Sequence, residues 1–325
     1  MMWEAPPPRL VWPIIGIFGV LAIATLVVAW LSWRYPQRNW QELKQRIRSW
    51  WVMITMFSVA LLLNRTVTLV FFAFVSFLAL KEYLSIIPTR RSDRRVLFWA
   101  YLAIPIQYWW IGHEWYAMFL IFIPVYMFLF LPMRTVMIGE TKGFLAAIGM
   151  LQWGLMVTVF SISHIAYLLV LPVAGTLSLP MPTETSSSMQ GWGPPLVLFL
   201  VMLTEGNDIA QFIFGKLFGR RKVAPSVSPG KTLEGLLGGI VTTIGLSVPL
   251  SRWLTPFGLP HALGAGALIS VGGFIGDLTI SAVKRDLGRK DSGSLIPGHG
   301  GILDRIDSLA YTAPLFFHFV SYFYF

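Results

Sequence analysis

The sequence predicts an all-α, polytopic integral membrane protein with about nine to ten transmembrane helices. Three observations support this prediction: 55% of the 325 residues are hydrophobic, only 12% are charged, and long apolar runs recur along the whole chain. A soluble domain would carry roughly 25% charged residues. An apolar run of about 20 residues is long enough to cross a hydrocarbon core of about 30 Å as a helix.

The apolar runs can be delimited in order along the chain. The first lacks a basic start and a small-residue cleavage site, so we expect it to stay in the protein rather than be removed as a signal peptide. The second and third are short, and the sixth is long enough to contain a kink or a re-entrant turn. The predicted spans are 11–33, 49–64, 66–80, 96–111, 115–132, 143–174, 195–214, 233–252, 262–280 and 303–325.

Polar content divides these spans into two groups. The loop 175–194 contains no lysine or arginine, and we expect it to be a flexible connector. Most of the distinctive polar residues follow position 200. We therefore predict N-terminal scaffold helices over residues 1–190 and a C-terminal catalytic region over residues 191–325.

The basic residues indicate how the chain is oriented. If the ten spans alternate in direction, Arg9, Arg65 and Arg252 lie on one side of the membrane and the other 22 of the 25 lysines and arginines lie on the opposite side. Because positive loops stay in the cytoplasm, the loops 215–232 and 281–302 are predicted to be cytoplasmic. We expect a bacterial inner membrane with the active site facing the cytoplasm.

The overall charge and the missing cysteines exclude several classes of function. The net charge of +10 is explained by this topology and by contact with anionic membrane lipids, so we expect no nucleic-acid partner. The chain contains no cysteine, which rules out disulfides, thiol nucleophiles and thiolate metal ligands.

The seventh span carries the first candidate site residues. Glu205 and Asp208 are three residues apart and therefore share a helix face. Asp208 lies roughly 9 Å inside the predicted membrane exit. A polar contact between helices would explain such a pair, but this depth favours a functional role for at least one of the two acids.

The basic segment 215–235 contains Gly230-Lys231-Thr232, which is reminiscent of a nucleotide-binding P-loop. The P-loop pattern fails, because its first glycine would fall on Pro225 and no strand precedes it. Ser228-Pro229 is instead a good pair to begin a helix. Free amides at that helix start, beside Lys231, could bind phosphate, although a charged loop is more often only solvated.

The strongest signal lies in residues 272–308. Asp277, Ser281, Lys284 and Arg285 fall on nearly one stripe of a helix that leaves the membrane. A simple ion pair between Asp277 and Lys284 would account for part of this stripe. The charged and glycine-rich continuation through residue 308 makes a functional site the better interpretation, because charge beside a bilayer is expensive.

The end of this segment predicts a metal site. Glycines around His299 allow the backbone to approach a ligand closely, and the last helix is expected to begin just after them. Asp304 and Asp307 would share one face of that helix. Together with Asp277 they could form an oxygen-rich cage suited to Mg²⁺.

At fixed spacing these residues resemble the signature of the phosphatidate cytidylyltransferases, also called CDP-diacylglycerol synthases. The resemblance covers roughly residues 195–310. One departure is Gln211, where the pattern has an aromatic residue directly after Ala210. The matching positions are Asp208 with the following Phe-x-x-Gly-x-x-x-Gly, Ser228-Pro229-x-Lys231-Thr232-x-Glu234-Gly235, Ser281-Ala-Val-Lys284-Arg285, Lys290-Asp291, Gly293, Pro297, His299-Gly300-Gly301, Asp304-Arg305 and Asp307.

The resemblance implies a reaction of CTP with phosphatidate that gives CDP-diacylglycerol and pyrophosphate in phospholipid biosynthesis. It also implies two cations on Asp277, Asp304 and Asp307, one of them Mg²⁺ and the second divalent or monovalent, and a homodimer. The implied catalytic residues are Lys284, Arg285, Lys290, Asp291, His299 and Arg305. The implied substrate-binding residues are Asp208, Ser228, Lys231, Thr232, Glu234, Ser281, Gly298, Gly300 and Gly301.

Two other functions stay open at this point. A cytidylyltransferase for an isoprenoid phosphate, or a CTP-dependent polyprenol kinase, would use similar apolar walls, and neither the acyl chain nor the choice of CTP over dCTP can be read from them. An ion-coupled transporter fits less well. Transporters tend to place charge near the bilayer midplane within paired repeats, whereas here the charge is at the membrane edge and no repeat is visible.

Overall fold

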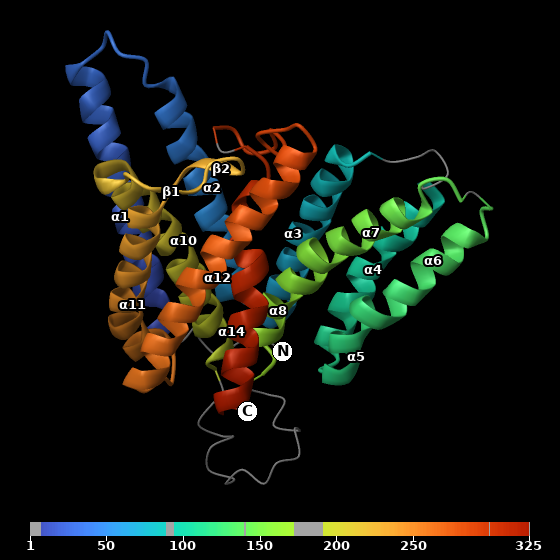
Figure 1. Ribbon diagram of the computed structural model, residues 1–325. Coiled ribbons are helices and arrows are strands. Elements are labelled where there is room, and N and C mark those ends of the chain that lie inside the picture. The colour runs from blue at the N-terminus through green and yellow to red at the C-terminus, as the bar shows by residue number, and fades with distance from the viewer. Residues whose placement is uncertain (1–7, 89–93, 140, 172–190, 299, 325) are drawn as a thin grey trace.

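A computed structural model describes residues 8–88, 94–139, 141–171, 191–298 and 300–324 of the chain. The described residues form an all-α protein with one short two-stranded hairpin, as predicted (Figure 1). In chain order the elements are α1 (Pro8–Arg34), α2 (Gln41–Leu63), α3 (Arg65–Ile86), α4 (Arg94–Gly112), α5 (Tyr116–Ile121), η2 (Phe122–Met127), α6 (Phe128–Val136), α7 (Phe144–Leu155), η3 (Met156–Phe160), α8 (Ser161–Leu168), α10 (Gly193–Phe218), β1 (Lys222–Ala224), β2 (Ser228–Thr232), α11 (Leu233–Leu254), α12 (Leu259–Asp286), α13 (Leu303–Ile306) and α14 (Leu309–Tyr324).

The helices are those of an integral membrane protein. Within the described ranges, eight are long and apolar enough to cross a bilayer, with α5, η2 and α6 forming one of them and α7, η3 and α8 another. The helices α4 and α14 are not among the eight. At 16 residues, α14 extends only about 24 Å. The β1–β2 hairpin and the loop after α12, which carry much of the basic charge, lie at the same edge of the bundle (Figure 1).

Two of the long helices contain a π-helical turn. One of these turns, η2, includes Pro124, which has no N–H to donate to the preceding turn, and the Phe119 carbonyl five residues before it accepts a hydrogen bond of 3.0 Å from Gln107 Nε2. The other turn, η3, lies inside the sixth predicted span, whose length allowed for a kink or a re-entrant turn. Residues 172–174 of that span, and most of the predicted connector 175–194, lie outside the described residues.

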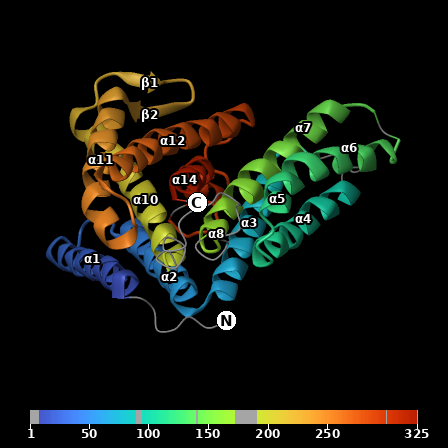
Figure 2. The same cartoon turned by 90° about the horizontal axis from the view of Figure 1, so that it is seen from below.

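The helices form two groups that meet along a central layer. Seen from below, α1, α2, α10, α11 and α12 lie on one side and α4 to α7 on the other, with α3, α8 and α14 between them (Figure 2). Fully buried aromatic rings of Phe119, Tyr167 and Phe317 pack against one another at the junction of α5, α8 and α14. This apolar junction connects the N-terminal helices to the C-terminal ones.

A stripe of buried polar side chains on α10 fixes the C-terminal helices around the site. Asn207 is fully buried, accepts a hydrogen bond of 3.1 Å from Thr243 Oγ1 of α11 and donates one of 3.3 Å to the Ser270 carbonyl of α12. Thr204 contacts Thr312 of α14 at 3.1 Å. Where apolar side chains face a lipid-like interior, such contacts set the angular position of one helix against the next.

Two of the expected helix boundaries are wrong. Ser228-Pro229 does not begin a helix: it belongs to β2, which pairs with β1 in an antiparallel hairpin, and α11 begins at Leu233 with the Thr232 hydroxyl accepting the Gly235 N–H. The last helix is interrupted after α13. Between the end of α13 at Ile306 and the start of α14 at Leu309, the Asp307 carboxylate accepts the Ser308 N–H, a local bond that competes with the helical ladder.

Candidate functional site

A cavity of about 1000 Å³ lies at the edge of the bundle, beside the β1–β2 hairpin. Its walls come from α2, α10, α11, α12, α13 and β2, together with the loop 287–302 that connects α12 to α13. Segments that are distant in the sequence therefore meet there. Most of the predicted site residues line this cavity: Asp208, Ser228, Lys231, Thr232, Asp277, Lys284, Lys290, Asp291, Gly298, Gly300, Asp304, Arg305 and Asp307.

One lysine–aspartate pair joins the hairpin to α12. Lys231 Nζ lies 2.5 Å from Asp277 Oδ2, and both side chains are about one-fifth exposed. The other oxygen of Asp277 accepts a hydrogen bond of 3.2 Å from Ser281 Oγ, one turn further along α12. Asp277 is therefore paired with Lys231, and the simple Asp277–Lys284 ion pair considered as an alternative is not formed.

A second pair joins α12 to α13. Lys284 Nζ lies 2.6 Å from Asp304 Oδ1, and both side chains are only 10% exposed. Asp304 Oδ2 accepts the N–H groups of Ser292 and Gly301. Burial favours the neutral acid, but Lys284 and the Ser292 amide outweigh it and hold the pKa of Asp304 below its usual value.

The negative charges of two further carboxylates, Asp208 and Asp307, are stabilised less well than that of Asp304. Asp208 Oδ2 accepts a hydrogen bond of 2.8 Å from Ser308 Oγ, whereas its Oδ1 is buried and has no hydrogen-bond partner within the described part of the chain. Asp307 lies in the break before α14. Burial raises the pKa of Asp307 well above its usual range, and the neighbouring Asp277 and Asp208 carboxylates raise it further. These acids therefore lie close enough to repel one another.

This donor set fits a hard cation. Carboxylate oxygens are the ligands that Mg²⁺ prefers, and Asp208, Asp277 and Asp307 line the same cavity. Among the described residues, no three acidic or histidine side chains are already gathered as a metal site. Asp304, with Lys284 and two amides on its oxygens, is the most fully engaged of the three predicted ligands. The metal assignment stays a prediction.

Five predicted site residues are not seen at the cavity wall. Arg285 points away, donating to the Val227 carbonyl and to the Arg289 carbonyl. Glu234 accepts the N–H groups of Arg220 and Arg221 and so fixes the chain between α10 and β1. Ser281 and Gly301 contact site aspartates from behind the cavity wall, and His299 lies outside the described residues.

Comparison with known proteins decides the family. A model of the cytidylyltransferase family matches residues 44–323, which is most of the chain. The chain belongs to this family. It is therefore a nucleotidyltransferase, and the family that the motifs of residues 195–310 resemble is confirmed.

Individual relatives agree with this family. An uncharacterized protein of Escherichia coli (strain K12), YnbB, is 48% identical over 306 residues, which are 94% of this chain and 96% of the relative. A phosphatidate cytidylyltransferase of Haemophilus influenzae is 42% identical over 161 residues, 47% of this chain and 53% of that enzyme. One of Pseudomonas aeruginosa is 46% identical over 123 residues, 37% of this chain and 45% of that enzyme. The matches thus span about half the length of these two enzymes.

The cytidylyltransferase cavity also contains residues that sequence reasoning missed. Leu43, Arg46, Ile47 and Trp50 of α2 form one wall, although the N-terminal helices were expected to be only a scaffold. Their spacing of three and four residues places them on one helix face, which was visible in the sequence. Nothing in the sequence indicated that this face meets α10 and α12 rather than lipid.

Gln211, which the sequence marks as a departure from the family pattern, also lines the cavity. Its side chain is 4% exposed, and its Oε1 accepts a hydrogen bond of 3.1 Å from Lys231 Nζ. An aromatic side chain at this position could not accept that bond. In this cytidylyltransferase, Gln211 and Asp277 together hold the Lys231 ammonium at the cavity wall.

Replacing Gln211 by leucine should weaken catalysis without unfolding the protein. The substitution keeps the side-chain size but removes one of the two acceptors of Lys231, and a hydrogen bond to a charged group contributes about 1.5–3 kcal/mol. We expect kcat/KM to fall by roughly tenfold to a hundredfold. Steady-state kinetics of the purified variant measures this effect, with Ile213→Leu as the control, because Ile213 lies on the same helix, is exposed and does not line the cavity.

Proposed function

We propose that this enzyme transfers a cytidylyl group from CTP to phosphatidate, forming CDP-diacylglycerol and pyrophosphate in phospholipid biosynthesis. The observation that carries the proposal is the composition of the single cavity described above. Its polar walls bear carboxylates and ammonium groups, whereas α2 and α10 contribute Leu43, Ile47, Trp50, Ile209 and Phe212. Such a cavity suits one polyanionic and one amphipathic substrate.

The proposed reaction needs little acid–base catalysis. An oxygen of the phosphatidate phosphate attacks the α-phosphorus of CTP, forming a new P–O bond. The bond between the α-phosphorus and the oxygen bridging to the β-phosphate breaks, and pyrophosphate leaves with that electron pair. The attacking phosphate has a second pKa of about 6, so it is already largely ionised near neutral pH.

The main barrier is then repulsion between two polyanions and their alignment, which the basic residues can lower. Lys231 and Lys284 are each fixed by an aspartate and each line the cavity. Arg305 also lines it, which places a third basic side chain at the cavity. We assign these three residues, with Lys290, to the phosphates of the substrates.

Divalent cations would complete the charge balance. The residues that would hold them are Asp277, Asp304 and Asp307, with Asp208 as a further oxygen donor from α10. When bound, such ions would neutralise charge on the transferring phosphoryl group.

The same geometry supports a membrane orientation. The cavity is lined by β2 and by the loop after α12, which lie at the basic edge of the bundle (Figure 1), and basic edges of membrane proteins face the cytoplasm. The proposal therefore places the enzyme in a bacterial inner membrane, with CTP arriving from the cytoplasm and phosphatidate from the inner leaflet. A homodimer is part of the same proposal.

The decisive experiment measures pyrophosphate release by the purified full-length protein in detergent. We expect release that requires CTP, phosphatidate and Mg²⁺ together, and a lipid product containing the cytidylyl group. Polyprenyl phosphate in place of phosphatidate, and ATP in place of CTP, serve as the matched substrate controls. Activity with polyprenyl phosphate but not with phosphatidate would overturn the assigned acceptor, and release without any lipid would overturn the transfer itself.

A further inference from the structure

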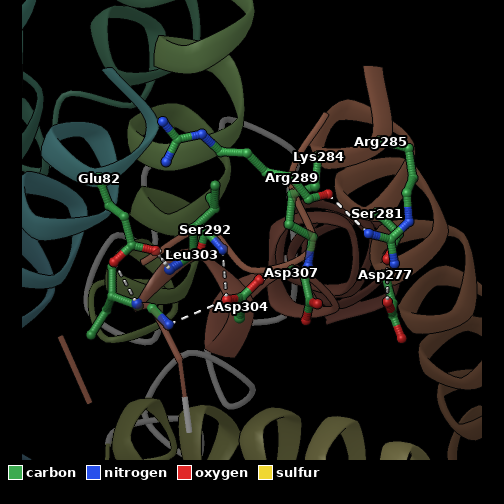
Figure 3. A network of polar contacts seen from close by, with 12 residues as sticks. Glu82, Asp277, Ser281, Lys284, Arg285, Arg289, Ser292, Leu303, Asp304 and Asp307 are labelled. Atoms are coloured by element: carbon green, nitrogen blue, oxygen red, sulfur yellow. Dashed lines mark hydrogen bonds and ion pairs between the residues drawn. The ribbon is translucent and has the colours of Figure 1, made fainter. Parts of the chain in front are cut away.

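Glu82, near the end of α3, lies at the back of the proposed active site. It is only 9% exposed and belongs to the N-terminal half of the chain. Its two carboxylate oxygens accept three hydrogen bonds from the segment 292–303: one from Ser292 Oγ, one of 2.9 Å from the Ile302 N–H and one of 3.1 Å from the Leu303 N–H. Figure 3 shows Glu82 and Asp304 on either side of this segment.

Two of these donors belong to the start of α13. The first amides of a helix have no partner within the helix and must find one elsewhere. In this chain the acceptor is a carboxylate from a helix more than 200 positions away in the sequence. Glu82 thus acts as the N-terminal cap of the short helix that carries Asp304 and Arg305, the two charged residues of α13 at the cavity.

Ser292 connects this cap directly to the site. Its hydroxyl donates to Glu82, and its backbone N–H donates to Asp304 Oδ2 at 3.1 Å. Asp304 in turn holds Lys284 at 2.6 Å. A continuous set of contacts therefore runs from Glu82 through Ser292 and Asp304 to the lysine at the cavity wall.

The fit leaves no room for a side chain at Gly301. A Cβ atom there would lie 1.7 Å from Glu82 Oε1, so the Glu82 carboxylate would have to move out of its present hydrogen bonds. The family motif around Gly300-Gly301 was expected to bring backbone close to a substrate. At Gly301 the close approach is instead to Glu82.

We infer that Glu82 is a positioning residue of the proposed cytidylyl transfer: it holds segment 292–303 and α13 so that Asp304, Arg305 and Lys284 meet the substrates. A buried carboxylate is tolerated only when its hydrogen bonds are made. The arrangement in which segment 292–303 makes all three hydrogen bonds to Glu82 is therefore favoured. This inference rests on the proposed function, because it gives Glu82 no contact with substrate.

The test uses Glu82→Gln in the full-length protein. Glutamine keeps the size but replaces one acceptor oxygen with an NH₂ group, which faces the same donors. We expect hydrogen exchange of peptides covering residues 292–303 to accelerate roughly tenfold or more. We expect kcat to fall about 10²-fold, as small misplacements of catalytic groups do, while KM for CTP stays near that of the unchanged protein. Glu82→Asp, which keeps the charge, should recover part of kcat.

A matched control is Glu114→Gln. Glu114 is a partly buried glutamate that pairs with Arg65 at 2.5 Å, at the turn between α4 and α5 on the opposite edge of the bundle. Its loss should leave kcat and the exchange of 292–303 unchanged. If Glu82→Gln is poorly folded, Ser292→Ala removes one donor and should show the same two effects at smaller size.

Two outcomes would overturn the inference. One is a Glu82→Gln enzyme with unchanged kcat. The other is a fall in kcat with no change in the exchange of segment 292–303, because Glu82 would then act by another route. If the unchanged protein releases no pyrophosphate at all, the proposed function fails, while the exchange measurement still decides whether Glu82 holds the segment.

Discussion

Asp277→Asn is expected to lower kcat by at least about 10²-fold. The substitution keeps the shape of a side chain that lines the cavity but removes the charge paired with Lys231 and one of the carboxylates assigned to a cation. Groups that stabilise charge in the transition state commonly contribute this much. The variant should also need more Mg²⁺ for half-maximal rate. Both effects are measured by pyrophosphate release across a Mg²⁺ titration.

Asp286→Asn is the control for this prediction, because Asp286 lies at the end of the same helix, is exposed and does not line the cavity. It should behave like the unchanged protein. An Asp277→Asn enzyme that retains more than half of the original kcat at saturating Mg²⁺ would remove Asp277 from the proposed machinery.

Lys284→Met is expected to reduce both activity and stability. Lys284 and Asp304 are each 10% exposed, so the substitution leaves Asp304 as a buried carboxylate without its cation. Breaking a buried pair in this way typically costs about 3–5 kcal/mol. The free energy of unfolding, measured by titration with a denaturing detergent, should fall accordingly.

The double variant Lys284→Met with Asp304→Asn separates the two effects. Asparagine keeps an oxygen for the Ser292 and Gly301 amides but carries no charge, so much of the lost stability should return. Activity should not return, because both site residues are gone. A double variant no more stable than Lys284→Met alone would show that the pair does not govern stability.

The membrane class, the position of nearly every helix and the family could all be predicted from the sequence. Hydropathy marks the spans because an exposed backbone polar group cannot be tolerated in lipid. The motif from Ser281 to Asp307 identifies the family because it specifies both the residue types and the spacing between them. Most of these residues indeed line one cavity.

Local boundaries were harder to predict because they depend on competing hydrogen bonds. Ser228-Pro229 suits a helix start, but pairing with β1 delays the helix to Leu233. The last helix was expected to be continuous, but it is interrupted at Asp307 and Ser308, where the Ser308 N–H donates to the Asp307 carboxylate. At Ser228-Pro229 a local preference of about 1 kcal/mol was outweighed by a strand pairing that the local pattern does not contain.

The sequence by itself determined the membrane class, the charge asymmetry and the set of chemical groups at the site, since each depends on residue type and spacing. Only the tertiary structure decided which partners those groups take. Lys231 pairs with Asp277, Lys284 with Asp304, and Glu82 of α3 holds a segment that follows it by more than 200 residues. Contacts between distant helices depend on how the helix faces pack, and that packing cannot be predicted from a local sequence pattern.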